Sequence, residues 1–307
     1  MYIVTNEEMT PRHNIINVLP RALKLNMYNI NLDEAEEIRL IQGKPMYIHY
    51  PDGDYYITSK GRLTREEKNG IIIEKKHIDE AMERITNSSL YAVANEIKHG
   101  YITIGGGHRV GIAGTAVTDG DTIEIIKNIS ALNIRIATEV IGCSDSVIDD
   151  IIDREIKNTL IVSPPGCGKT TLLRDIARVI SWRGYSVGIA DERCEIAAMH
   201  NGESSFDLGA HAVVLENCPK SYSMTTLLRS MSPDVIITDE LGEDEDVRAL
   251  STIINSGVTV IASAHGKSVN QLKNKPVFRK LLPMFEVIVI LSKRNGVGTV
   301  EEVIKQC

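Results

Sequence analysis

The sequence predicts an α/β protein in two parts: a mostly parallel sheet with helices on both faces, preceded by a smaller α+β domain. Two observations predict this division. From Leu160 onward, short apolar runs alternate with stretches of helical periodicity, which is typical of parallel strands joined by helices. Before about residue 140, helical stretches are followed by short alternating segments instead. We therefore expect one domain over residues 1–140 and another over residues 141–307.

Composition is that of a globular enzyme. Of the 307 residues, 43% are hydrophobic and 24% are charged, which is enough apolar material for two cores. The net charge of −7 argues against a dedicated nucleic-acid binder, which needs a basic face. The five cysteines form no C-x-x-C pair, so we expect a reduced, cytoplasmic compartment. Apolar runs such as residues 258–264 are too short for a membrane helix.

Three helices are expected in the N-terminal part. They cover residues 15–25, a stretch that starts at Asp33, and residues 77–85 with a continuation past Ser88 and Ser89. Alternating apolar and polar residues predict strands at 46–50, 55–58, 101–104 and 110–117. The glycines of residues 105–107 join the last two strands. Because a strand follows them, we predict a tight turn there and not a dinucleotide site.

Five short apolar runs are the expected strands of the C-terminal part. Such runs suit strands that are buried on both sides, and they cover residues 160–162, 187–190, 235–238, 258–262 and 287–291. The first run leads into a helix with apolar residues from Leu172 to Ile180 on one face. That helix is expected to end at Arg183 and Gly184, because glycine commonly follows a helix C-terminus.

A phosphate-binding loop lies between the first run and this helix. Its Gly-rich turn points backbone N–H groups toward one place, and the helix N-terminus adds a positive dipole. Lys169 is expected to reach the β- and γ-phosphates, and the Thr170 hydroxyl is expected to ligate Mg²⁺. Ser163 stands where the strict pattern has its first glycine. The predicted nucleotide-binding residues are Ser163, Pro164, Pro165, Gly166, Cys167, Gly168, Lys169, Thr170 and Thr171.

Polar residues follow the other predicted strands at their carboxyl ends. Ligands bind at that edge of an open parallel sheet. Asp239 and Glu240 close one strand in a Walker-B pattern, in which the aspartate holds Mg²⁺ and the glutamate orients the attacking water. Glu192 follows a second strand and His265 a third. The alternative for Asp239 and Glu240 is a solvated acidic turn, because four further acids follow at 243–246.

The nucleotide is expected to be ATP. Residues 239–242 also fit the D-x-x-G pattern of GTPases, but a guanine-reading N-K-x-D should then follow. The candidate, Asn274 to Val277, lacks the aspartate.

Several segments together resemble the type II/IV secretion ATPases. LRSMSPD before VIITDE resembles their approach to Walker B, residues 256–265 resemble their histidine box, and residues 189–192 occupy the place of their aspartate box. The stretches SSLYAVANEIKHGYITIGGGHRVGIAG, IKNISALNIRIATEVIG, SPPGCGKTTLLRD and ADERCEIA resemble a sporulation family of endospore-forming bacteria within that superfamily. The resemblance covers residues 2–304.

This resemblance implies a RecA-like ATPase domain and a hexameric ring. In that superfamily ATP lies between the two domains, and arginines from the N-terminal domain meet its phosphates. Arg135 and Arg109 are the matching candidates here, with ordinary surface arginines as the alternative. His265 would sense the γ-phosphate, with a structural histidine as the alternative. Because that family often has glycine where this chain has Asp239, the base stays open between Glu240, which we favour, and Glu192.

The resemblance also implies a function. The expected protein is an ATPase in the mother-cell cytoplasm that powers an envelope-spanning sporulation channel or its assembly. It would act on membrane-embedded channel proteins without inserting into the membrane itself. Two alternatives stay open at this point, an ATP-gated scaffold with little turnover and a RecA-like nucleic-acid motor, which the net charge disfavours.

Overall fold

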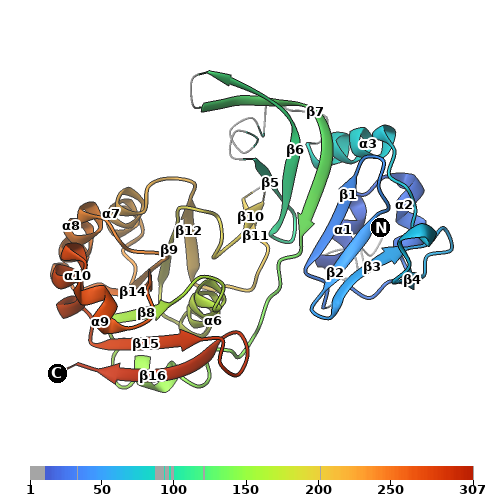
Figure 1. The fold of residues 1–307 in the computed structure, drawn as a ribbon. Coiled ribbons are helices and arrows are strands. Elements are labelled where there is room, and N and C mark those ends of the chain that lie inside the picture. The colour runs from blue at the N-terminus through green and yellow to red at the C-terminus, as the bar shows by residue number, and fades with distance from the viewer. Residues whose placement is uncertain are drawn as a thin grey trace, which may run out of the picture. The chain divides into compact units, whose positions relative to one another are not determined.

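The structure, a computed structural model, describes residues 11–32, 34–86, 93, 97, 100–119, 122–200 and 202–306. Two compact units make up the chain (Figure 1). The N-terminal unit comprises Met1–Thr138 with His200–Ser205, and the C-terminal unit comprises Glu139–Met199 with Phe206–Cys307.

The N-terminal unit is an antiparallel seven-stranded sheet with helices. Its helices are α1 (Pro11–Val18), α2 (Arg21–Met27), the 3₁₀ turn η2 (Glu67–Asn69) and α3 (Lys75–Ile85). Its strands are β1 (Glu37–Ile41), β2 (Tyr47–Tyr50), β3 (Gly53–Ile57), β4 (Leu63–Thr64), β5 (Tyr101–Ile104), β6 (His108–Asp119) and β7 (Thr122–Arg135). The strand order is β4-β3-β2-β1-β7-β6-β5. Apolar residues of the three α-helices and of alternate strand positions form one core.

Of the expected N-terminal helices, one is divided into two helices and one is wrong. The stretch 15–25 is broken into α1 and α2 at Leu19 and Pro20, because proline lacks an N–H and disfavours helical geometry in the residue before it. The stretch that follows Asp33 forms β1, in which Ile38 and Leu40 are fully buried and their neighbours are not. That period of two belongs to a strand. Asp33 itself lies outside the described residues.

The other N-terminal predictions fare better. The third helix is confirmed as α3 and ends at Ile85, whereas Ser88 and Ser89 lie outside the described residues. The four expected strands are present as β2, β3, β5 and β6, but β1, β4 and β7 were missed. The glycine turn is confirmed. Gly106 and Gly107 have φ of +84° and +72°, which suits the turn of a β5–β6 hairpin.

The C-terminal unit is a largely parallel sheet between two layers of helices. Its strands are β8 (Thr159–Ser163), β9 (Val187–Asp191), β12 (Ala212–Glu216), β13 (Val235–Thr238), β14 (Thr259–His265), β15 (Val287–Ser292) and β16 (Thr299–Lys305). Its helices are α5 (Ile148–Ile151), α6 (Lys169–Trp182), α7 (Lys220–Met231), α8 (Asp244–Asn255), α9 (Val269–Lys273), α10 (Pro276–Leu281) and the 3₁₀ turn η3 (Leu282–Met284). A separate short pair consists of β10 (Met199–His200) and β11 (Glu203–Ser204).

Both faces of this sheet are buried, as the apolar runs predict. The strand order is β12-β9-β13-β14-β8-β15-β16, and only β16 is antiparallel to its neighbour. Alternate strand residues pack against α5 and α6 on one face and against α7, α8 and α10 on the other (Figure 1). The predicted α/β fold class is confirmed. Helix α6 ends at Trp182, and Gly184 follows with φ of +91°.

Two further expectations concern the membrane and the thiols. None of the described helices is both long and apolar enough to cross a bilayer. Cys143, Cys167, Cys194 and Cys218 are free thiols, and Cys307 lies outside the described residues.

Candidate nucleotide site

The predicted phosphate-binding loop leaves the buried strand β8 and turns into α6. Gly166 and Gly168 have φ of +67° and +85°, values that glycine adopts without the strain a side chain brings. Gly168 is the N-cap of α6, and Lys169, Thr170 and Thr171 form its first turn. The first N–H groups of that helix lack intrahelical partners and are available to an anion.

Ser163 fits the position where the strict pattern has glycine. Its side chain is fully buried, and its hydroxyl donates to the carbonyl of Pro164 at 2.8 Å. The Lys169 Nζ donates to the Ser163 carbonyl at 3.3 Å, to the Ser163 hydroxyl at 3.4 Å and to the Pro164 carbonyl at 3.3 Å. Burial lowers the pKa of Lys169. The lysine ammonium thus donates hydrogen bonds to neutral oxygens of its own loop. The oxygens of a bound phosphate can replace these acceptors.

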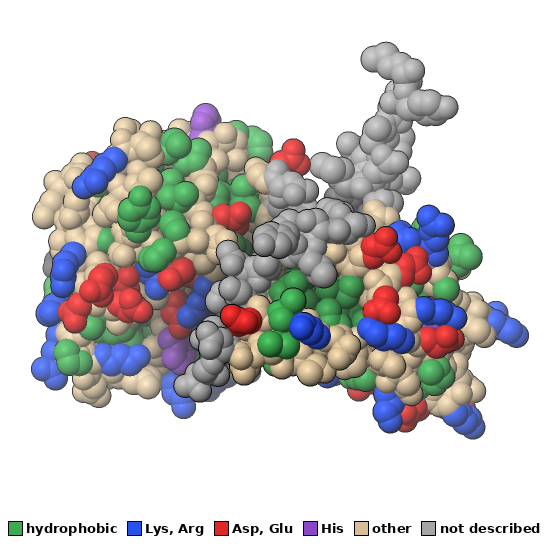
Figure 2. Space-filling view, turned by 90° about the horizontal axis from the view of Figure 1, so that it is seen from above, with side chains coloured by type: hydrophobic (Ala, Val, Ile, Leu, Met, Phe, Trp, Pro, Cys, Tyr) green, Lys and Arg blue, Asp and Glu red, His purple; other side chains and the backbone are tan. Residues whose placement is uncertain are grey.

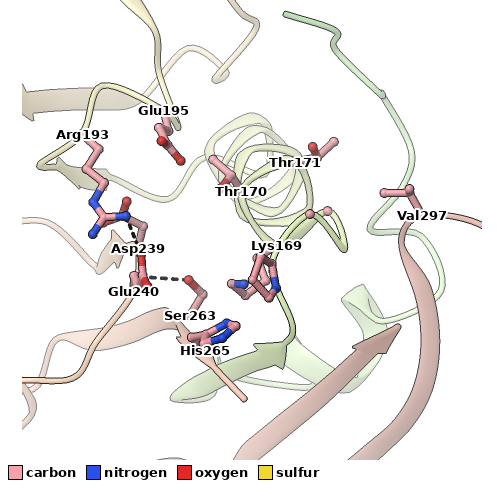
Figure 3. A pocket seen from close by; sticks show the side chains of 13 residues that line it. Lys169, Thr170, Thr171, Arg193, Glu195, Asp239, Glu240, Ser263, His265 and Val297 are labelled. Carbon is pink, nitrogen blue, oxygen red and sulfur yellow. Dashed lines mark hydrogen bonds and ion pairs between the residues drawn. The ribbon is translucent and has the colours of Figure 1, made fainter. Parts of the chain in front are cut away.

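A cavity of about 620 Å³ lies over this loop (Figure 3). One wall consists of the loop and the start of α6. The other is built by residues at the carboxyl ends of the neighbouring strands, which are Arg193, Glu195, Asp239, Glu240, Ser263 and His265. Strand register explains why these residues lie together, since Thr238 at the end of β13 pairs with Ala190 on β9 and with Ala262 on β14. His265 pairs with Ser163 at the same edge.

Glu240 is held from two directions. Its backbone N–H donates to the Ser263 hydroxyl at 3.0 Å, and its carboxylate accepts from Arg193 Nη1 at 2.7 Å (Figure 3). Its φ is +28°, a backbone region that costs on the order of 1–3 kcal/mol for a residue other than glycine. Strain of this kind at a cavity wall is characteristic of functional sites.

Asp239 is a buried acid among other acids. The residue is only 5% exposed. Burial raises the pKa of Asp239 to about 7, and the charge of Asp191 adds to the effect, against the cations Lys220 and Arg193. Together with the Thr170 hydroxyl, Asp239 offers the oxygen ligands that Mg²⁺ prefers. No cluster of three or more His, Cys, Asp or Glu suited to a metal occurs in the described part of the chain.

Glu192 is not among the residues that line the cavity. Its carboxylate pairs with Lys220 Nζ at 3.1 Å, and Lys220 is 13% exposed at the start of α7. Glu195 lines the cavity instead. The fully buried Asp191 fixes the course of the loop after β9, because its carboxylate accepts hydrogen bonds from the N–H groups of Glu195, Ile196 and Ala197 at 2.8–2.9 Å.

Arg174 fixes the same loop from the other side. From α6 it donates to the carbonyls of Glu195 and Ile196 at 2.8 and 2.7 Å, and its guanidinium lies over the ring of Phe206. The loop that carries Arg193 and Glu195 is therefore held at its backbone by a carboxylate and a guanidinium.

The two candidate arginines lie in the other unit. Arg109 on β6 and Arg135 on β7 are direct cross-strand partners. Arg135 pairs with Glu37 at 3.4 Å, and Arg109 lies 4.9 Å from the centre of the Tyr101 ring. Their contact with a phosphate stays a prediction.

Four cavity residues were missed by the sequence analysis. Arg193 and Glu195 lie within four residues of the end of β9, and Ser263 precedes His265 on β14, so the strand-end rule could have included them. Val297 comes from the turn between β15 and β16, and no motif marks it. Cys167 is buried within the loop.

The raised pKa of Asp239 gives a pH-dependent prediction. From about pH 4 to pH 7 the folded protein keeps a proton on Asp239 that the unfolded chain releases, so this group's contribution to the free energy of unfolding falls as pH rises. Without nucleotide and Mg²⁺, Asp239→Asn should raise stability at pH 8 by on the order of 2 kcal/mol and change it little at pH 5.

Thermal melts at the two pH values measure this difference. Asp153→Asn, which changes an acid that is 70% exposed, is the matched control and should shift neither melt. A loss of stability in Asp239→Asn at pH 8 would contradict the prediction.

Comparisons with known proteins agree with this geometry. The ATPase DotB of Legionella pneumophila is 15% identical with a TM-score of 0.52, and the alignment covers 83% of this chain and 72% of DotB. The pilus retraction motor PilT, solved with ADP, is 15% identical with a TM-score of 0.56 and coverage of 84% and 74%. At this identity the likeness shows the fold, which is that of these P-loop ATPases.

The sequence comparisons are more specific. The stage III sporulation protein AA of Bacillus subtilis (strain 168) is 36% identical over 301 residues, which covers 95% of this chain and 94% of the relative. The family model described as sporulation stage III, protein AA matches residues 9–306. The secretion-ATPase resemblance and its sporulation branch are thus confirmed, and the chain belongs to the sporulation stage III protein AA family.

Proposed function

We propose that this protein is an ATPase that hydrolyses ATP to drive a membrane-embedded sporulation channel or its assembly. The observation that carries the proposal is the meeting of Lys169 and Thr170 with Asp239 and Glu240 across one cavity. These are the groups that phosphoryl transfer to water requires. Release of inorganic phosphate from ATP and Mg²⁺ at steady state by the full chain is the direct test.

The chain's residues divide the work of hydrolysis. The backbone N–H groups of the loop and Lys169 hold the β- and γ-phosphates. Glu240 accepts a proton from the water whose oxygen bonds to the γ-phosphorus, while the bond from that phosphorus to the ADP oxygen breaks and ADP leaves with the electron pair. His265, which lines the same cavity at the end of β14, would contact the γ-phosphate. Thr170 and Asp239 would hold Mg²⁺, which neutralises charge on the phosphates.

Two further candidate functions differ in what supports them. The ion pair that occupies Glu240 favours an ATP-gated scaffold with little turnover. Phosphate release separates this candidate from the motor. A nucleic-acid motor has less support, since the net charge is −7 and Figure 2 shows basic side chains interspersed with acidic ones on the face drawn.

The family suggests where the activity is used. A curated relative is named as a stage III sporulation protein. We propose that this chain acts in the mother-cell cytoplasm and reaches the membrane through channel proteins. Arg135 and Arg109 would meet the nucleotide in a closed form, and rings of six chains would form on it.

Lys169→Ala should weaken ATP binding with little change in fold, because Lys169 is half-buried in the loop and holds only weak contacts of its own. We expect the dissociation constant for ATP with Mg²⁺, measured by calorimetry, to rise at least tenfold. Lys280→Ala removes a surface lysine that pairs with Asp244 and should leave the constant unchanged. An unaltered constant in Lys169→Ala would refute the assignment.

Glu240→Gln should bind ATP and Mg²⁺ but hydrolyse ATP about 10²- to 10⁴-fold more slowly, because an amide cannot accept the proton. Glu192→Gln is the matched comparison. Since Glu192 pairs with Lys220 and does not line the cavity, its loss should cost far less turnover. If Glu240→Gln keeps normal turnover and Glu192→Gln has none, the catalytic base is Glu192 and the assignment to Glu240 is wrong.

Assembly should be linked to nucleotide. ATP stabilises the proposed closed form, and neighbouring chains would pack on that form. ATP therefore shifts the equilibrium from single chains toward the ring. Native mass spectrometry should find six times the 33.9 kDa protomer mass with ATP and Mg²⁺, more of it in Glu240→Gln and less in Arg135→Ala. A monomer that persists with ATP, in Glu240→Gln and with the purified channel proteins present would favour the scaffold.

A further inference from the structure

The ion pair between Arg193 and Glu240 lies inside the proposed nucleotide site. Arg193 Nη1 donates to Glu240 Oε2 at 2.7 Å, and the two side chains are 59% and 42% exposed (Figure 3). They follow β9 and β13, which are neighbours in the sheet. A carboxylate oxygen that accepts a guanidinium N–H is engaged in a charged hydrogen bond, which competes with its use as a base for water. In this state the group proposed to activate water is occupied.

The surroundings allow Arg193 to leave while Glu240 stays. The N–H of Glu240 is bound to Ser263, and the loop of Arg193 is fixed at its backbone by Asp191 and Arg174. The exchange therefore requires a change in the Arg193 side chain and leaves these backbone contacts in place. Its guanidinium already lies in the cavity whose other wall carries Lys169, which is proposed to hold the phosphates.

A triphosphate offers Arg193 a stronger partner. The planar guanidinium matches a phosphate with two parallel hydrogen bonds, whereas a half-exposed ion pair contributes little by itself. The carboxylates of Glu195 and Glu240 on this wall attract a cation when no phosphate is bound. A terminal phosphate brings further negative charge that competes for the same guanidinium.

We propose that Arg193 is a positioning residue that exchanges partners with the γ-phosphate. Without that phosphate it holds Glu240 in an ion pair. When ATP binds, the guanidinium transfers to the γ-phosphate and frees the Glu240 carboxylate to bind the attacking water. ADP lacks the γ-phosphate, so the ion pair between Arg193 and Glu240 stays formed when ADP is bound. This inference rests on the proposed function and adds how the site distinguishes ATP from ADP.

A double-mutant cycle in nucleotide binding tests the exchange. Dissociation constants of ATPγS and of ADP, each with Mg²⁺, are measured by calorimetry for the full chain, Glu240→Gln, Arg193→Gln and the double variant. Glu240→Gln removes the charge that ATPγS must displace, so ATPγS should bind about two- to fivefold tighter. Arg193→Gln should weaken ATPγS roughly tenfold. The constant for ADP should change less than twofold in each.

The coupling is the decisive outcome. In the Arg193→Gln background, Glu240→Gln should no longer tighten ATPγS, because the pair that it relieves is already absent. Arg193→Lys keeps the positive charge and should recover part of the ATPγS affinity. Lys280→Gln is the matched control, since its pair with Asp244 has a similar length of 2.9 Å and similar exposure of 61% and 56% outside the cavity. It should change neither constant.

The results separate the exchange from the function on which it rests. If the wild-type protein binds and hydrolyses ATP, but Arg193→Gln weakens ADP as much as ATPγS, the exchange is rejected and the function stands. The same holds if Glu240→Gln tightens ATPγS equally with and without Arg193. A wild-type protein that neither binds nor hydrolyses ATP rejects both.

Discussion

The candidate site depends on one constraint, the burial of β8, β9, β13 and β14 on both faces of a parallel sheet. Because the strands run in the same direction, every loop after a strand emerges at the same edge, and the helices that cover both faces leave that edge open. Lys169, Glu240 and His265 are far apart in the sequence, yet this arrangement brings them to one cavity. An antiparallel neighbour in the middle of the sheet would send its loop to the opposite edge.

Within the cavity, the balance of charge decides which acid can do what. The Asp191 carboxylate accepts hydrogen bonds from three backbone N–H groups, and Glu192 is paired with Lys220. Asp239 is buried and resists ionisation, which suits a ligand that becomes charged when a divalent cation arrives. Glu195 and Glu240 both line the cavity over the phosphate loop, and Glu240 is paired with Arg193. Neighbouring carboxylates of similar chemistry thus have different environments.

The sequence predicted what depends on local pattern. The glycine-rich loop, its lysine and the acids after β13 are adjacent in the chain, and strands buried on both sides appear as continuous apolar runs. The break between α1 and α2 could also have been predicted from Pro20. Strands β1 and β7 were missed although each pairs with a neighbour in the sequence, β2 and β6, and their pairing with each other, as with Ile38 opposite Ile134, is non-local. The contact of Arg193 with Glu240 spans two strands, and Val297 reaches the cavity from the β15–β16 turn, so neither could be predicted from spacing.

The left-handed backbone of Glu240 sets the stability of this protein against its proposed activity. At φ of +28° glycine or asparagine fits the chain better than glutamate does. Selection of variants for thermal stability alone would therefore favour replacement of this carboxylate, which is the group proposed to activate water. A stabilised form intended to retain turnover has to keep this position fixed and gain its stability elsewhere, away from the carboxyl edge of the sheet.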